Sequence, residues 1–426
     1  MYKSIFLSII AFLFVHVKAQ DVDYARNVVK TLSSKKFKGR GYVGDGNKIA
    51  VRYIKKQFNS IGLKSFGDNY AQPFHVEVNT FPSVMTLKVD SVELVPGQDY
   101  IIDPLSASIK GKYPLVHIKK HELLDEEKFK STLNSSAGKV LVIDEIDFHP
   151  KDKEQERQAN ELIKVLKYNP NVPFVSVIIN TNKKLTWSTA TQQASKPSFT
   201  VNSKLDFSNT KNVEIYVDAR LINFTTENLI GYIEGTTYTD SFLVVTAHYD
   251  HLGQMGTDTY FPGANDNASG IAMLLSLAKH FQEYPPKYSI AFIATAAEEI
   301  GLLGVKHFVN NPLFDLQKIK FLVNFDLAGT GDEGIKVVNG SIHQKQFNAL
   351  SQINSENNYL ASVQKRGEAC ISDHCMFHEK GVPCFYIYTL GGIQAYHDIY
   401  DRNETLPLTE FADYNRLMID FFNSFE

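Results

Sequence analysis

Residues 244–271 read VVTAHYDHLGQMGTDTYFPGANDNASGI, and this stretch decides the fold that the sequence predicts. A β-rich apolar run ends in His248 and Asp250, a loop follows, and Asp266 stands just ahead of a helical pattern. A strand end, a polar loop and a helix start form the unit in which open α/β sheets place their ligands. One imidazole and two carboxylates therefore mark a candidate site at this point of the chain.

Four apolar runs alternate with helical patterns from residue 223 onward. The runs predict strands at 241–246, 288–295, 321–325 and 382–388, and the patterns between them predict helices at 267–284, 301–310 and 343–357. Near-continuous apolar strands separated by helices are typical of a largely parallel sheet that is covered on both faces. The sequence therefore predicts an α/β fold in which helices sandwich a mostly parallel mixed sheet.

The residues before this core divide into two parts that differ in predicted secondary structure. Helical spacing at 22–32 and at 47–61, where Gly62 is a candidate C-terminal cap, predicts that residues 20–82 are an N-terminal part of the domain formed by 223–426. Between 83 and 222, short β-rich runs and one charged helix at 154–167 predict a smaller, β-rich inserted domain. The alternative is that this part is an elaborate edge of the main domain.

The amino terminus has the features of a secretory signal peptide. Lys3 precedes a short apolar run at 5–17, and Ala19 marks a cleavage point before Gln20, so residues 1–19 are predicted to be removed. The alternative is a membrane anchor, but a spanning helix needs about 20 apolar residues and this run is shorter. We therefore expect a secreted or periplasmic protein that has no membrane anchor after cleavage.

Charge and cysteine usage narrow the function classes further. The net charge of −3 gives no reason to expect nucleic acid as a partner. The three cysteines contain no CxxC pair, so a thiolate zinc site is not expected. Cys370 and Cys375 are close enough to pair if the loop bends back, and the sequence leaves this open. Because the count is odd, at least one thiol stays free.

Residues of metal-binding types fall at the ends of the predicted strands and in the loops that follow them. They are His248, Asp250, Asp266, Glu298, Glu299, Asp326 and His397. Because the carboxyl ends of parallel strands share one edge of a sheet, residues far apart in the sequence can converge there. Imidazoles and carboxylates together suit a divalent metal, with zinc favoured among sites of nitrogen and oxygen ligands.

The number of these residues matches a site for two metals. Two metals need about five protein ligands, one of them shared, and a set of that size is His248, Asp266, Glu299, Asp326 and His397. Glu298 is then free to serve as general base. Asp250 lies two residues from His248, on the same side of an extended chain, and can hold the imidazole tautomer.

Each of these residues has a structural explanation when it is taken alone. A single histidine or aspartate at a strand end is more often structural, and Glu298 with Glu299 could simply favour the positive end of a helix. The convergence of several strand ends is what favours a metal site. The roles of His251 and of the run 372–374 stay open, and we leave them outside the metal ligands.

Five motifs resemble those of metallopeptidase family 28, which contains co-catalytic zinc aminopeptidases. They are AHYDHLG at 247–253, GANDNASGIAMLL at 263–275, AAEEIGLLG at 296–304, NFDLAG at 324–329 and YHDIYD at 396–401. The motifs cover the last ~200 residues in order. The segment KFKGRG at 36–41 is similar to that family's opening segment, and the insert loosely resembles a protease-associated domain.

The resemblance implies a role for each matching residue. His248 and Asp326 would bind one Zn²⁺ and Glu299 and His397 the other, with Asp266 as the bridge. Glu298 would be the general base, Asp250 would orient His248, and Tyr396 is a weaker candidate for steadying the oxyanion. The resemblance also implies a cis peptide bond between Asp266 and Asn267.

The expected function is that of an exported aminopeptidase with two Zn²⁺ per chain, acting on peptides with a free N-terminus. The alternatives are a carboxypeptidase or dipeptidase of the same clan, and a glutaminyl-peptide cyclotransferase, which typically works with one zinc. A non-catalytic module that kept the fold would be expected to have lost ligands or the base, and none is missing here. The residue preference and the oligomeric state are not readable from the sequence.

Overall fold

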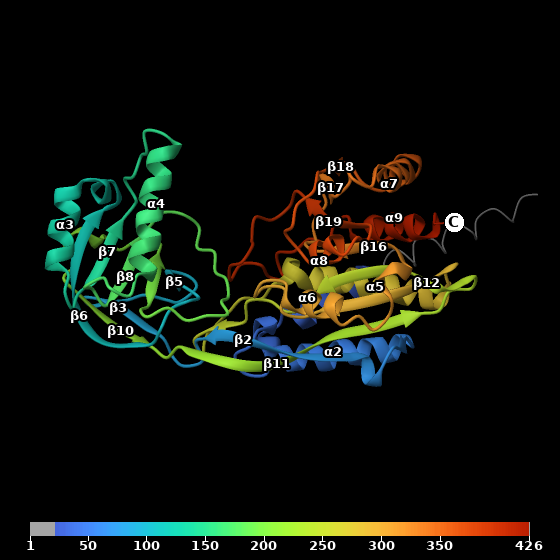
Figure 1. Cartoon of the computed structure of the whole chain (residues 1–426), viewed down its shortest axis with the longest axis horizontal. Coiled ribbons are helices and arrows are strands. Elements are labelled where there is room, and N and C mark those ends of the chain that lie inside the picture. Colours follow the sequence, from blue (N-terminus) through green and yellow to red (C-terminus); the bar gives the residue numbers. More distant parts are fainter. Residues whose placement is uncertain (1–21, 426) are drawn as a thin grey trace, which may run out of the picture.

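The computed structural model describes residues 22–425, so the predicted signal peptide lies outside the described residues. Two large sheets dominate this part of the chain. Figure 1 shows the first sheet with most of the helices at one end of the long axis and the second sheet at the other. Among residues 22–425, no helix combines the length and apolar character that crossing a membrane requires.

The first sheet has nine strands, and its centre is parallel. Its order is β1 (Lys64–Ser65), β11 (Arg220–Ile233), β15 (Tyr288–Thr295), β12 (Tyr238–His248), β16 (Ile319–Phe325), β19 (Cys384–Leu390), β17 (Gly334–Val338) and β18 (Val363–Lys365), and β2 (Ala71–Thr80) also pairs with β11. The pairs from β15 through β12 and β16 to β19 are parallel, whereas β11 and β17 join antiparallel. The four central strands are those predicted, and the mixed α/β fold is confirmed.

The flanking strands were missed because their sequences are half polar. β2 alternates between buried and exposed residues over most of its length, and β11 begins with RLINFTTEN. These two strands pair antiparallel over residues 71–80 and 220–229. One face of such an edge pair meets water, so it lacks the continuous apolar run that marks the buried central strands.

Alternating side chains of the central strands face two separate cores. Leu243, Val245 and Ala247 of β12 belong to one hydrophobic cluster, and Phe242 and Val244 belong to another. The first cluster includes residues of the helix at 22–32, α2 (Gly46–Ile61), α5 (Gly270–Glu283), α7 (Gln344–Asn357) and α9 (Phe411–Asn423). The second includes residues of α6 (Leu303–Asn310) and α8 (His374–Glu379). The predicted sandwich therefore follows from the two-residue period of the strands.

Helix ends agree with the sequence where a cap was visible. Gly62 ends α2 in the left-handed conformation, with φ 87°, and its N–H donates to the carbonyls of Phe58 and Asn59. The predicted helix at 267–284 instead begins as a short irregular turn, η5 (Ala264–Ser269), before α5. Asp266 and Asn267 have non-helical backbone angles inside that turn.

The described residues also contain short 3-10 helices. They are η1 (Lys35–Arg40), η2 (Asp68–Tyr70), η3 (Lys120–Leu124), η4 (Phe207–Asn209) and η6 (Leu316–Lys318).

The second sheet is built within residues 86–217. Its order is β4 (Val92–Glu93), β3 (Thr86–Val89), β10 (Asn212–Val217), β6 (Ile109–Lys119), β7 (Val140–Asp144), β8 (Ser176–Asn180), β9 (Ser198–Val201) and β5 (Tyr100–Ile102). Helices α3 (Glu126–Ser135) and α4 (Lys153–Tyr168) belong to this part of the chain. We refer to residues 83–222 as the insert.

The insert shares a hydrophobic core with the loop that follows β12. Leu252, Met255 and Phe261 of that loop lie in the same buried cluster as Leu87 and Trp187 of the insert. The loop contains a small hairpin, β13 (Gln254–Met255) with β14 (Thr259–Tyr260). The second sheet is therefore packed directly against the segment that connects His248 to Asp266.

Candidate active site

The parallel strands bring most of the predicted residues to one sheet edge. His248 is the last residue of β12, Asp326 directly follows β16, and Glu298 lies three residues beyond the end of β15. Asp266 lies in η5, and His397 lies in the loop between β19 and α9. Residues that are up to 149 positions apart in the sequence thus meet at the carboxyl edge of the sheet, as expected for this topology.

The two carboxylate oxygens of Asp266 face different imidazoles. Asp266 Oδ1 lies 3.5 Å from His248 Nε2, and Asp266 Oδ2 lies 3.0 Å from His397 Nε2. His248 Nε2 is also 3.5 Å from Asp326 Oδ1, and His397 Nε2 is 3.2 Å from Glu299 Oε2. Asp266 therefore stands between two imidazole–carboxylate pairs.

At this edge of the sheet, two groups of three residues have ligand atoms close enough to share a cation. His248, Asp266 and Glu299 have ligand atoms within 4.8 Å of one another, and so do His248, Glu298 and Asp326. Glu298 therefore lies among the metal-type residues in space as well as in sequence. A pocket of about 430 Å³ opens over these groups, and its wall also includes Leu302, Leu327, Cys370, Ile371, Tyr386 and Tyr396.

The buried carboxylates of this cluster favour the binding of a cation. Burial raises the pKa of Glu298 and of Glu299 well above the ordinary value, and neighbouring carboxylates raise both further. Burial lowers the pKa of His248, but the charges of Glu298 and Asp326 outweigh it and raise that pKa. Divalent cations would neutralise this concentration of buried carboxylates, and imidazole with carboxylate oxygens is a donor set that suits zinc.

Asp250 contacts both His248 and the turn that carries Glu298 and Glu299. Its carboxylate Oδ1 is 3.9 Å from His248 Nδ1, whereas the backbone carbonyl of Asp250 is 3.2 Å from that nitrogen. The carboxylate instead accepts from the backbone N–H of Glu298 at 3.1 Å and of Glu299 at 3.3 Å, and from the hydroxyl of Tyr42 at 3.2 Å. Because these donors occupy its oxygens, Asp250 supports the Glu298–Glu299 turn and meets His248 through its main chain.

Tyr396 lies beside the site but packs on a ring. Its ring stacks on the imidazole of His397, with centroids 4.0 Å apart and planes 13° from parallel. Tyr396 is 44% exposed and lines the pocket. Burial of its hydroxyl raises its pKa, so this group stays protonated at neutral pH and could donate a hydrogen bond.

Two residues near Asp266, His251 and Asp401, make contacts in the site that the sequence did not reveal. His251 Nδ1 lies 2.6 Å from Glu299 Oε1 and is fully buried. Asp401 accepts from the backbone N–H of Asn265 at 2.8 Å and of Asp266 at 3.0 Å. The Asp266–Asn267 peptide bond is cis, as the resemblance implied. His251 and Asp401 both stand inside quoted motifs, so position in a motif was the available signal.

Arg40 supports the same loop from the N-terminal segment. Its guanidinium is buried and donates to the backbone carbonyls of Tyr249, Pro262 and Gly263 at 2.7 to 2.8 Å, and to that of Asp266 at 3.2 Å. The two ends of the loop after β12 are thereby held together. The sequence marked this residue only as part of the KFKGRG segment.

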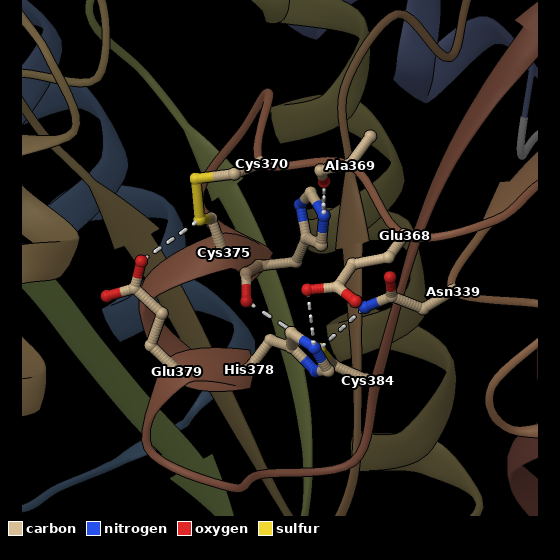
Figure 2. The surroundings of a disulfide bond; sticks show 9 residues. Asn339, Glu368, Ala369, Cys370, Cys375, His378, Glu379 and Cys384 are labelled. Carbon is tan, nitrogen blue, oxygen red and sulfur yellow. Dashed lines mark hydrogen bonds and ion pairs between the residues drawn. A yellow bond between two sulfur atoms is a disulfide. The ribbon is translucent and has the colours of Figure 1, made fainter.

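The run 372–374 supports Asp326 from behind. Ser372 Oγ donates to Asp326 Oδ2 at 2.8 Å, and Ser372 itself accepts from Asn324 at 2.8 Å. Cys370 and Cys375 form a disulfide on either side of this run, as Figure 2 shows, which resolves the pairing that the sequence left open. Cys384 is buried and free. Ser372 thus meets Asp326 as a hydrogen-bond donor.

Comparison with known proteins finds one matching family of peptidases. Residues 228–422 match the family model of peptidase family M28. The aminopeptidase YwaD of Bacillus subtilis is 30% identical over 174 residues, which are 38% of this chain and 35% of that protein. A probable leucine aminopeptidase 2 of Aspergillus oryzae is 30% identical over 138 residues, 32% of this chain and 26% of that protein. The matched region of this chain thus spans about a third or less of these M28 relatives.

Solved structures resemble nearly the whole chain in fold. The zinc aminopeptidase of Bacillus subtilis superposes with a TM-score of 0.65 at 20% identity, covering 93% of this chain and 94% of its own. The peptidase M28 precursor of Shewanella amazonensis gives 0.67 at 18% identity, covering 96% of both chains. The predicted resemblance to metallopeptidase family 28 is confirmed over residues 228–422, and the two relatives are named as aminopeptidases.

Proposed function

We propose that this protein is an exported zinc-dependent aminopeptidase that uses two Zn²⁺ per chain. The observation that carries the proposal is the position of Asp266, whose two oxygens face His248 and His397. A carboxylate between two imidazole–carboxylate pairs is the arrangement that a shared ligand requires. His248 with Asp326 would hold one Zn²⁺, and Glu299 with His397 the other. Bound zinc supplies a Lewis acid that polarises the scissile carbonyl and acidifies water.

Glu298 is the proposed general base. It lies beside His248 and Asp326, and burial raises its pKa. A base with a raised pKa can take a proton from water and pass it to the leaving amine. Because Glu298 also groups with His248 and Asp326 as a possible ligand, its role is decided by whether its removal abolishes activity or metal binding.

A free amino group is the proposed anchor of the substrate. The buried carboxylates line one side of the pocket, and they attract a cationic terminus more than a carboxylate terminus. Leu302, Leu327 and Ile371 offer apolar surface for the first side chain. The disulfide between Cys370 and Cys375 holds the segment that carries Ile371. Tyr396 is the proposed donor to the developing oxyanion, through its protonated hydroxyl.

The test uses the mature protein with its metal content assayed. Aminoacyl p-nitroanilides should be hydrolysed, and N-acetylation of the same compounds should abolish hydrolysis. Glu298→Gln should lower kcat about 10²- to 10⁴-fold while two metals stay bound. Glu368→Gln is a matched control, because Glu368 pairs with His378 at 3.3 Å outside the pocket.

Other outcomes would replace the proposal. Two metals with hydrolysis of N-blocked peptides would indicate a carboxypeptidase or dipeptidase. One metal with cyclisation of N-terminal glutamine would indicate a glutaminyl-peptide cyclotransferase. Loss of metal in Glu298→Gln would make Glu298 a ligand.

The proposal of export, to the periplasm or the medium, rests on the leader sequence. N-terminal sequencing of the exported protein should therefore find Gln20 as the first residue.

A further inference from the structure

The segment between β8 and β9 leaves the insert and reaches the candidate metal site. We call residues 184–190 of this segment the strap. The strap has no regular secondary structure, yet Trp187 is only 4% exposed. It makes hydrogen bonds to residues more than 100 positions away in the sequence, at Glu299 and in the loop that carries His397. These contacts join the insert to one side of the site.

The strap holds the imidazole of His397 by its main chain. The N–H of Trp187 donates to the carbonyl of His397 at 2.9 Å, and the carbonyl of Trp187 lies 3.1 Å from His397 Nδ1. Because a carbonyl can only accept, this contact places the ring proton on Nδ1. The lone pair then resides on Nε2, the nitrogen that faces Asp266 and Glu299. A carbonyl behind the ring is how proteins commonly orient a metal-binding histidine.

Two side chains of the strap contact the main chain of Glu299 and the loop around His397. Thr189 Oγ1 donates to the backbone carbonyl of Glu299 at 2.6 Å. Lys184 Nζ lies 2.7 Å from Asp398 Oδ2, next to His397, and it donates to the carbonyl of Gln394 at 2.7 Å. Asp398 is 4% exposed, whereas Lys184 is half exposed. The lysine therefore pairs with this buried carboxylate from the solvent side of the loop.

The strap is itself anchored in the insert. Trp187 Nε1 donates to the carbonyl of Ile102 in β5 at 2.8 Å. Its indole stacks on Phe261, with centroids 4.7 Å apart. The carbonyl of Ala190 accepts from the N–H of Asn79 in β2 at 2.8 Å. A buried ring with partners on both domains makes the strap a fixed support.

The other imidazole–carboxylate pair is held from within the core. His248 Nδ1 contacts the carbonyl of Asp250 at 3.2 Å, and Asp326 accepts from Ser372 at 2.8 Å. All four residues lie between 248 and 372. Glu299 is also supported by Asp250 through its N–H, so the strap adds to the core on that side.

We propose that the strap is a positioning element for one metal only, the one held by Glu299 and His397. The insert thereby raises the affinity of that position and leaves the position of His248 and Asp326 unaffected. This inference rests on the proposed two-metal function. Lys184, Trp187 and Thr189 are positioning residues, because they act through His397, Asp398 and Glu299.

The test measures each metal separately in the full mature chain. The double variant Lys184→Met with Thr189→Val removes the side-chain contacts and keeps similar volume. Metal-free protein is titrated with Zn²⁺ in chelator buffers, and Co²⁺ absorption spectra report the occupied positions. We expect one of the two dissociation constants to rise about 10- to 100-fold, as for other residues that support a ligand, with the other constant within about twofold. Lys184→Arg with native Thr189 should keep both constants near wild type.

A matched control is Lys183→Met with Thr186→Val, two exposed positions in the same segment. Lys183 lies 3.5 Å from Glu145, within the insert. The control should bind both metals as wild type does. Unchanged constants in the strap variant, or equal weakening of both metals, would overturn the inference. Fewer than two metals in wild type would instead overturn the proposed function, so the two failures are distinguishable.

Discussion

The two imidazole–carboxylate pairs of the site are built in different ways. His248 and Asp326 stand at the ends of adjacent parallel strands, β12 and β16. Glu299 and His397 come from loops, and the insert contacts both through the strap. Strand ends are rigid because the sheet fixes them, whereas loops need added support. The comparison teaches that the residues of one pair are held by the core sheet, whereas those of the other pair also have hydrogen bonds to the insert.

The largest effect is expected where the two halves meet. Asp266→Asn should abolish binding of both metals and lower hydrolysis to background, because Asp266 faces both imidazoles. Metal content by plasma emission and the initial rate on an aminoacyl p-nitroanilide measure this. Asp258→Asn is the control, since Asp258 is exposed in the same loop. Retention of one tightly bound metal would show that the halves are independent and that Asp266 is not shared.

A smaller effect is expected from the core half alone. Ser372→Ala removes the donor to Asp326 Oδ2 and should weaken one metal about 10- to 100-fold. The metal affected should be the one that the strap variant leaves intact, so a combination of both changes should weaken both. Stepwise titration of metal-free protein measures the two constants. If Ser372→Ala and the strap variant weaken the same metal, the division into two halves is wrong.

The sequence located candidate residues of both halves, but it did not reveal the strap. The four central strands are continuous apolar runs, so their ends and the residues that follow them, His248, Glu298, Glu299 and Asp326, could be located from the hydrophobic pattern. Convergence then followed from the topology of a parallel sheet. Asp266 and His397 were found by chemical type and by their motifs, and the structure brings both to the same edge.

The supports of the site could not be read in the same way. Trp187 contacts His397 with backbone atoms, and a backbone contact leaves no residue type to recognise. None of the candidate site residues predicted from the sequence lies in the insert. Asp250 was assigned to His248 by spacing and by the family resemblance, and neither could show that its carboxylate also accepts from the N–H groups of Glu298 and Glu299.

The smallest expected effect is the pH dependence of stability in metal-free protein. Burial raises the pKa of Asp373, near the core half, to about 7. Burial lowers the pKa of His397, but Glu299 and Asp266 outweigh it and raise it to about 9. Both groups bind protons more tightly in the folded state than in the unfolded chain. Their contribution is therefore lost as pH rises, for Asp373 between about 4 and 7 and for His397 between about 6.5 and 9.

Denaturant unfolding in the presence of a chelator, at pH 5 to 9, measures this loss. Each such group contributes at most about 1.4 kcal/mol per pH unit within its window. Below pH 6.5 the lowered pKa of His251, caused by burial, opposes the trend, so the clearest slope lies above it. Asp373→Asn should reduce the slope below pH 7 and leave the slope between 7 and 9. His397 contributes to that remaining slope together with the other groups of the site whose pKa is raised, which are His248, Glu298 and Glu299. Metal-free protein that becomes more stable from pH 7 to 9 would contradict the charge distribution on which both halves depend.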